Sequence, residues 1–180
     1  DYASWTFRKA PKFFDVVTWT GNGVSGREIS HNLGTTVGCV MVKNTSNAEN
    51  WMVYHIGSGI DGQLNLNTTA AATDDSTQFN DTVPSSTVLT LGSNAEVNAN
   101  GQTYVAYLFA HNNGDGEFGP DGDQDIIKCG SYTGNAHTGQ YINIGFEPQW
   151  LMIKRINQGS ANWVILDTMR GLFHGDNPQA

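Results

Sequence analysis

Short apolar runs recur about every ten residues along the chain, separated by clusters of Gly, Asn, Asp and Ser. The runs are rich in β-branched and aromatic residues, which favour strands. The run 103–110, TYVAYLFA, is apolar at nearly every position, which is typical of a central strand covered on both faces. Only the alanine-rich stretch 67–76 is compatible with a helical turn. The pattern therefore predicts strands within 15–20, 39–43, 51–56, 86–91 and 103–110, and an all-β fold of β-sandwich, jelly-roll-like type.

The sequence pattern occurs twice in the chain. The stretch FFDVVTWTGN from Phe13 returns as IIKCGSYTGN from Ile126, followed in the same order by CVMVK and WLMIK, then by NAENWMVYH and GSANWVILD. This alignment places Lys43 with Lys154 and Trp51 with Trp163. A second echo, YASWTFRKA from Tyr2 and YVAYLFAHN from Tyr104, precedes each copy. A period of roughly 110 residues is too long for a solenoid and predicts tandem domains.

The repeat divides the chain into four parts. Residues 1–12 resemble the terminal strand of a preceding unit, and residues 13–111 form one complete sandwich unit. Residues 112–124 are an acidic, Gly-rich linker, and residues 125–180 are the first half of a second, related unit. Whether residues 2–9 pair within the chain or with a neighbouring chain stays open at this point.

Composition and charge disfavour two classes of binding partner for this chain: nucleic acids and membranes. Charged residues make up 14% of the chain, the net charge is −8, and the nine basic residues are scattered. A nucleic-acid partner is therefore not expected, because such proteins carry a basic stripe. No apolar segment is long enough to span a bilayer, so membrane insertion is not expected either. Cys39 and Cys129 each lie in an apolar run and are interpreted as small buried hydrophobic residues, with a disulfide between them as the alternative.

The strongest candidate for a metal site lies in the linker. Asp121, Asp123 and Asp125 alternate, and carboxylates two residues apart on a loop can converge on Ca²⁺. The EF-hand pattern fails, because no Gly occupies the sixth position and no Glu closes the loop. A solvated linker is the favoured interpretation, calcium is the only candidate cofactor, and these three residues are its candidate ligands.

The five tryptophans offer faces for sugar stacking, but Trp51 and Trp163 occupy equivalent positions of the repeat, which favours packing for both. The pairing of Trp19 with Tyr132 is interpreted in the same way. Contact with a glycan is expected instead in the loops 44–50, 57–62 and 157–162. No GxSxG or HExxH motif is present, so the sequence assigns no catalytic residue.

The strings VGCVMVKNTSNAENWMVYH, TYVAYLFAHN, DIIKCGSYTGN and IGFEPQWLMIKR together resemble a repeated β-rich module of marine bacteriophage (cyanophage-like) virion structural and tail-fibre proteins. The resemblance covers nearly the whole chain; it departs where the first copy has TTVG and the second has FEPQ. It implies a non-catalytic, oligomeric tail-fibre or adhesin-type protein, made in the host bacterial cytoplasm and located in the virion. The implied partners are other virion proteins, further copies of the chain, and a glycan or protein of the host surface. The alternatives are a capsid or tail decoration or assembly protein that binds only virion proteins, and, less favoured, a glycan-degrading tail enzyme.

Overall fold

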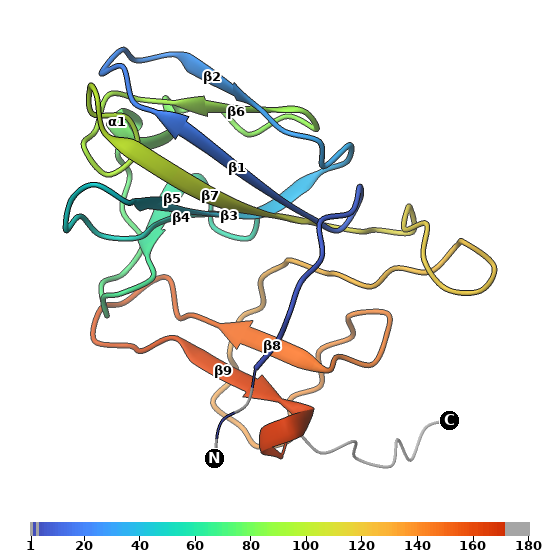
Figure 1. Cartoon of the computed structure of the whole chain (residues 1–180). Coiled ribbons are helices and arrows are strands. Elements are labelled where there is room, and N and C mark those ends of the chain that lie inside the picture. Colours follow the sequence, from blue (N-terminus) through green and yellow to red (C-terminus); the bar gives the residue numbers. More distant parts are fainter. Residues whose placement is uncertain (1, 3, 172–180) are drawn as a thin grey trace.

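The computed structural model describes residues 2 and 4–171, and its largest element is a five-stranded antiparallel sheet (Figure 1). The strand order is β1-β7-β3-β4-β5. The strands are β1 (Phe14–Thr20), β3 (Val37–Asn44), β4 (Met52–His55), β5 (Gly59–Asn65) and β7 (Thr103–Ala110). Along β7, the side chains of Tyr104, Ala106, Leu108 and Ala110 are buried on one face. The prediction of an all-β fold is confirmed, and the apolar run 103–110 is a central strand between β1 and β3.

One face of this sheet carries the main core. A two-stranded antiparallel ribbon, β2 (Arg27–Ser30) and β6 (Val88–Leu91), packs over it. Leu89 and Leu91 of β6 lie in the same cluster as Val40 and Leu108 of the sheet, and all four side chains are 0% exposed. The main core therefore lies between the large sheet and the ribbon.

The only α-helix in the described residues is α1 (Ser76–Phe79), which contributes Phe79 to this core. The helical turn expected within 67–76 was wrong in position, because the helix begins at the last residue of that stretch. Asp75 sets the start, since its carboxylate accepts the backbone N–H of Thr77 at 2.9 Å as an N-cap. Upstream, Ala72 donates its N–H to Ile156 at 2.9 Å, which holds the alanines in an extended connection.

The C-terminal part lies against the other face of the five-stranded sheet. It contains the antiparallel pair β8 (Trp150–Ile153) and β9 (Val164–Asp167), followed by the 3₁₀ turn η1 (Thr168–Arg170). A second cluster joins the two parts: Cys39, Val53 and Leu64 of the sheet pack with Cys129, Ile156 and Trp163. Both faces of the central sheet are therefore covered, by the ribbon on one side and by the C-terminal part on the other (Figure 1).

Three expectations differ from the structure. Residues 4–9 form no strand, and the predicted terminal strand is represented only by a bridge between Ala10 and Phe14. Residues 126–132 form no strand, because Ile127 and Cys129 pack against the first unit instead. Tyr132 is 52% exposed and is not a packing counterpart of the buried Trp19.

Two further findings concern the cysteines and membrane insertion. Cys39 and Cys129 are free thiols, as favoured from the sequence. Among the described residues no helix has the length and apolar character needed to cross a bilayer. The arrangement of two sandwich units in tandem stays a prediction.

Candidate binding pocket

A cavity of about 620 Å³ lies where the C-terminal part meets the five-stranded sheet. This volume is within the usual range for small-molecule sites, roughly 300–1,000 Å³. Three parts of the chain line it: residues 5–7 and 13 near the N-terminus, strands of the large sheet, and residues 124–129, 144, 146–152 and 163 of the C-terminal part. The pocket therefore exists only because segments from both ends of the chain meet over one face of the sheet.

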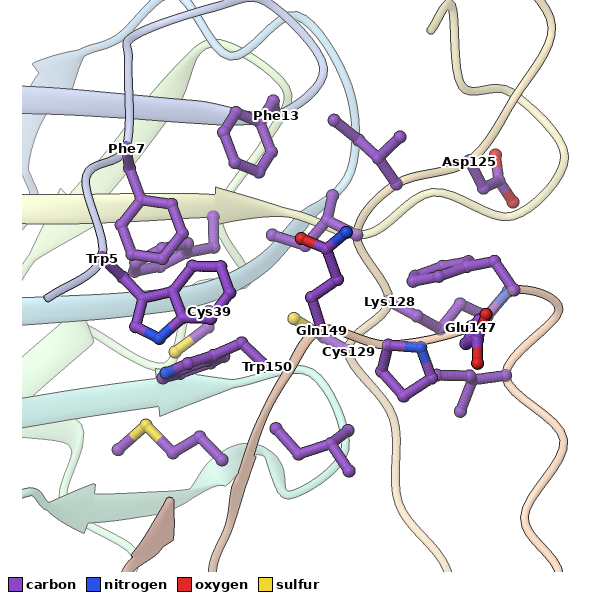
Figure 2. A pocket seen from close by; sticks show the side chains of 18 of the residues that line it. Trp5, Phe7, Phe13, Cys39, Asp125, Lys128, Cys129, Glu147, Gln149 and Trp150 are labelled. Carbon is purple, nitrogen blue, oxygen red and sulfur yellow. The ribbon is translucent and has the colours of Figure 1, made fainter. Parts of the chain in front are cut away.

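One wall of the pocket is aromatic. Phe7 lies at its centre, with its ring centroid 6.0 Å from that of Phe13, 5.8 Å from Phe109 and 6.3 Å from Trp150. Figure 2 shows Trp5, Phe7 and Trp150 next to one another on this side. The period of β7 explains the position of Phe109, because alternate residues of a strand point to opposite faces and its neighbours Leu108 and Ala110 fill the core. The edge-to-face contacts at Phe109 and Trp150 stabilise the arrangement of these rings.

The opposite wall combines polar and apolar side chains. In Figure 2, Gln149 projects between the aromatic side chains and Lys128 and Glu147, while Asp125 lies farther off. The same stretches of chain also line the cavity with apolar side chains: Ile126, Ile127, Ile144, Phe146 and Pro148. Asp125 is held by the loop that carries it, since its two carboxylate oxygens accept the N–H groups of Gly114 at 2.8 Å and Gly116 at 2.9 Å. Lys128 Nζ donates to the side chain of Asn113 at 2.7 Å. The pocket thus has aromatic rings on one side and a mixture of hydrogen-bonding and apolar groups on the other.

The floor is apolar and uncharged. Burial raises the pKa of the Cys39 thiol well above its usual range, and burial raises the pKa of Cys129 to about 12. Both thiols are therefore protonated at neutral pH and are poor nucleophiles. Burial, with the nearby His111 as a second cause, lowers the pKa of His55, whose Nδ1 accepts the N–H of Gly57 at 3.0 Å. The titratable groups on the sheet side of the cavity are neutral near pH 7.

The structure places the predicted metal ligands in a tight turn. Residues 118 and 124 exchange backbone hydrogen bonds across it, and Asp121 and Asp123 are exposed. Within the described residues, one group of three carboxylates has ligand atoms within 4.8 Å of one another: the exposed Asp61, Asp74 and Asp81. The linker aspartates do not form such a group there, and the calcium hypothesis stays a prediction.

Three of the tryptophans make packing contacts, and Trp5 and Trp150 line the pocket. Trp19 is buried, stacks on Tyr104 with ring centroids 5.5 Å apart, and donates its Nε1–H to the carbonyl of Val97. Trp163 donates its Nε1–H to the carbonyl of Asn65 at 2.9 Å, which fastens β9 to the large sheet. Trp51 stacks on Tyr107 with ring centroids 6.2 Å apart. The packing interpretation of these three is therefore consistent with the structure.

Sequence reasoning missed Trp5, Phe7 and Trp150 as pocket residues and placed glycan contact in the loops 44–50, 57–62 and 157–162. None of these loops lines the pocket. The repeat offered a signal, because Trp150 stands where the first copy has Cys39. A bulky ring in place of a small side chain marks a place where the two copies differ.

A family model described as Domain of unknown function (DUF7483) matches residues 9–177. No curated protein and no solved structure matches the chain.

Proposed function

We propose that this chain, which belongs to the family described as Domain of unknown function (DUF7483), is a non-catalytic attachment module of a bacteriophage virion that binds a neutral glycan of the host surface in the pocket. The observation that carries the glycan proposal is an aromatic wall, with Phe7 and Trp150, that faces hydrogen-bonding side chains, among them Gln149. The assignment to a virion is supported by the resemblance of its strands to phage structural modules.

The two walls fit the chemistry of a sugar ring. A pyranose has one face of C–H groups, which packs on aromatic rings, and a rim of hydroxyl groups, which needs donors and acceptors. Trp5 and Trp150 offer the rings, while Gln149 offers an amide that can both donate and accept hydrogen bonds.

The charges around the pocket and on the whole chain favour a neutral ligand. Two carboxylates, Asp125 and Glu147, and one ammonium group, Lys128, line the cavity, and the whole chain carries a net charge of −8. This field repels an acidic polysaccharide. A weak single site is sufficient for attachment if many copies act together on one particle, because linked sites raise the overall affinity by orders of magnitude.

A second candidate function, assembly with other virion proteins, is favoured by the outer surface of the C-terminal hairpin. Val164, Ile165 and Leu166 of β9 are 46%, 43% and 41% exposed, and Met169 of η1 is 62% exposed. Val164 and Leu166 point to one face of β9 and Ile165 to the other, so exposed apolar side chains stand on both faces of the strand. Exposed apolar residues on a short strand pair are candidates for contact with another protein. Such contacts are compatible with glycan binding, since these residues do not line the pocket.

The test is binding of the full chain to an array of neutral and acidic host-type glycans, with Trp150→Ala as the test variant. Trp51→Ala is the matched control, because it removes another partly buried indole that lies outside the pocket. We expect binding to a neutral glycan, weakened about tenfold or more by Trp150→Ala, as loss of about 1.4 kcal/mol of stacking requires, and nearly unchanged in the control. Absence of glycan binding by the unmodified chain, or equal losses in both variants, would overturn the proposal. Release of reducing sugars would establish the enzyme instead.

A further inference from the structure

The hairpin β8–β9 repeats the pairing of β3–β4 position for position. In the first unit, Cys39 pairs with His55 and Val42 pairs with Met52. In the second, Trp150 pairs with Asp167 and Ile153 pairs with Val164. The alignment of Lys43 with Lys154 and of Trp51 with Trp163 makes these pairs equivalent residue by residue. The two copies of the sequence therefore share a strand register as well as a pattern.

The two hairpins differ at their other edge. Strand β3 has a second partner, β7, which pairs with it antiparallel from Val37↔Ala110 to Asn44↔Tyr104. Strand β8 pairs only with β9 among the described strands. An edge of this kind presents a row of backbone N–H and C=O groups that can accept a further strand. By equivalence with β3, the strand that fits β8 has the side-chain pattern of β7.

The N-terminal segment, defined as Ser4–Lys9, has that pattern. Its alignment with β7 places Trp5 with Tyr107 and Phe7 with Phe109. In the first unit Phe109 lies opposite Cys39, and Tyr107 lies opposite Met41. Carried over to the second unit, the same register places Phe7 opposite Trp150 and Trp5 opposite Met152.

The structure already contains the side-chain part of this pairing. The ring centroids of Phe7 and Trp150 are 6.3 Å apart in an edge-to-face contact, and Trp5 and Met152 line the same pocket. Exposure alternates along the segment as in a strand with one buried face, with Trp5 and Phe7 partly buried and Thr6 and Arg8 exposed. No backbone hydrogen bond joins the segment to β8 in the described part of the chain.

We propose that the N-terminal segment, which forms no strand in the structure, pairs antiparallel with β8 of its own chain in solution and so adds a third strand to the β8–β9 sheet, in the register of β7 on β3. Thr6 then lies opposite Leu151, as Leu108 lies opposite Val40. The strand of the same chain is the occupant because Phe7 already contacts Trp150 of β8, while the bridge between Ala10 and Phe14 tethers the segment to β1. A tethered strand at such short range has a high effective concentration and outcompetes a strand from another molecule.

The polar residues of the segment agree with this placement. In β7, Ala106, Leu108 and Ala110 face the buried core, whereas Ser4, Thr6 and Arg8 stand at the equivalent positions of the segment. The ribbon β2–β6 covers that face in the first unit, and the described residues contain no such cover over β8. A strand with one aromatic and one polar face therefore fits β8: the aromatic face closes the pocket and the polar face meets water.

A disulfide cross-link between Thr6→Cys and Leu151→Cys tests the register in the full chain, with both native cysteines replaced by Ala. Directly opposite residues of an antiparallel pair have Cα atoms about 4.5–5.5 Å apart, within disulfide range. The control is Thr6→Cys with Ile153→Cys, a diagonal pair about 7–8 Å apart that points to the same face. We expect the first pair, and not the second, to form a cross-link within one molecule under mild oxidation.

The cross-linked products show which strand pairs with β8, that of the same chain or that of a second copy. A cross-linked dimer in place of the monomer would overturn the proposal in favour of strand exchange between copies, and no cross-link, or equal yields for the two pairs, would overturn the pairing itself. Because the cysteine replacements can impair folding, amide hydrogen exchange of the unmodified chain is the second measurement. Protection of alternate amides in residues 4–9 together with β8 supports the strand, and exchange at unprotected rates in residues 4–9 contradicts it. Neither result depends on glycan binding, so this inference and the proposed function fail independently.

Discussion

At Gly38, near the start of β3, the C-terminal part of the chain approaches the five-stranded sheet closely. A Cβ atom added at this position would lie 2.6 Å from the Sγ atom of Cys129 and 2.8 Å from the carbonyl oxygen of Ala110. Both distances are shorter than real carbon contacts allow, and the carbonyl belongs to β7, which pairs with β3. The sulfur of Cys129 thus occupies the space that a side chain on Gly38 would need.

Gly38→Ala should therefore push residues 126–130 away from the sheet and destabilise the chain. Overpacking a filled site costs about 1–3 kcal/mol, and here the rigid partner is backbone, so the mobile partner is the Cys129 segment. The matched control is Gly130→Ala in the same segment. An added Cβ there meets nothing within 4 Å and the backbone angle is not in the left-handed region, so its effect should remain below about 1 kcal/mol.

The reactivity of Cys129 reports the displacement directly. Burial raises the pKa of its thiol to about 12, so at about pH 8 only one molecule in roughly 10⁴ is a thiolate. A released thiol with a pKa near 8.5 is about one quarter thiolate at that pH, and its reaction with a disulfide reagent should be about 10³-fold faster. The assay is stopped-flow labelling, with the modified cysteine identified by mass spectrometry, alongside urea unfolding of the same variants.

Two results would refute this reasoning. If Cys129 reacts in the unmodified chain at the rate of an exposed thiol, the C-terminal part does not dock on β3 as described. If Gly38→Ala and Gly130→Ala have equal unfolding midpoints and equal labelling rates, the contact at Gly38 does not hold the two parts together. Cys39, which is 6% exposed within β3, should remain unlabelled in the unmodified chain and serves as the internal reference.

Stability should fall on acidification below about pH 6.5, because burial lowers the pKa of His31, so the unfolded chain binds a proton that the folded chain does not. The nearby Asp15 raises the pKa of His31 and partly opposes this effect, so the free energy of unfolding falls by at most about 1.4 kcal/mol per pH unit. In urea unfolding between pH 7.5 and 5.5, the stability of His31→Gln should depend less steeply on pH than that of the unmodified chain. An unchanged pH dependence would exclude His31 as a source. For the linker carboxylates Asp121, Asp123 and Asp125, excess chelator should leave the melting temperature unchanged, since both oxygens of Asp125 already accept backbone N–H groups. A calcium site occupied at a hundred times its dissociation constant would contribute about 2.7 kcal/mol, so a fall in melting temperature on chelation would restore the calcium hypothesis.

The strands that the sequence predicted are those whose apolar pattern reflects a fully buried position. Strands β3 and β7 are the clearest cases, because each pairs on both edges and contributes to both clusters. Strand β5, GIDGQLN, was missed because it is an edge strand with two glycines and three polar residues, and its position depends on pairing with β4. Strand β2, REIS, buries only Ile29 and is specified by its partner β6. Edge strands of this kind depend on tertiary contacts more than on their own propensity.

The pocket could not be predicted from local pattern for a related reason. Its aromatic wall joins Phe7, Phe109 and Trp150, which lie far apart in the sequence, and their meeting depends on how the C-terminal part docks on the sheet. The acidic run of the linker was easier to notice, but its aspartates are spread around a tight turn whose backbone hydrogen bonds close it without a cation. A run of ligand-type residues in sequence is weaker information than side chains that converge in space.

The repeat nevertheless explains why a pocket forms at this place. Cys39 and Met41 on β3 and their equivalents Trp150 and Met152 on β8 all line the same cavity. Two copies of one hairpin therefore present the same register positions to a shared space. If both copies had small residues there, the sheets could close on each other; the indole of Trp150, opposite the position of Cys39, holds them apart and gives the space an aromatic wall. The shared register supplies the scaffold, and the difference between Cys39 and Trp150 is the feature on which the proposed glycan site depends.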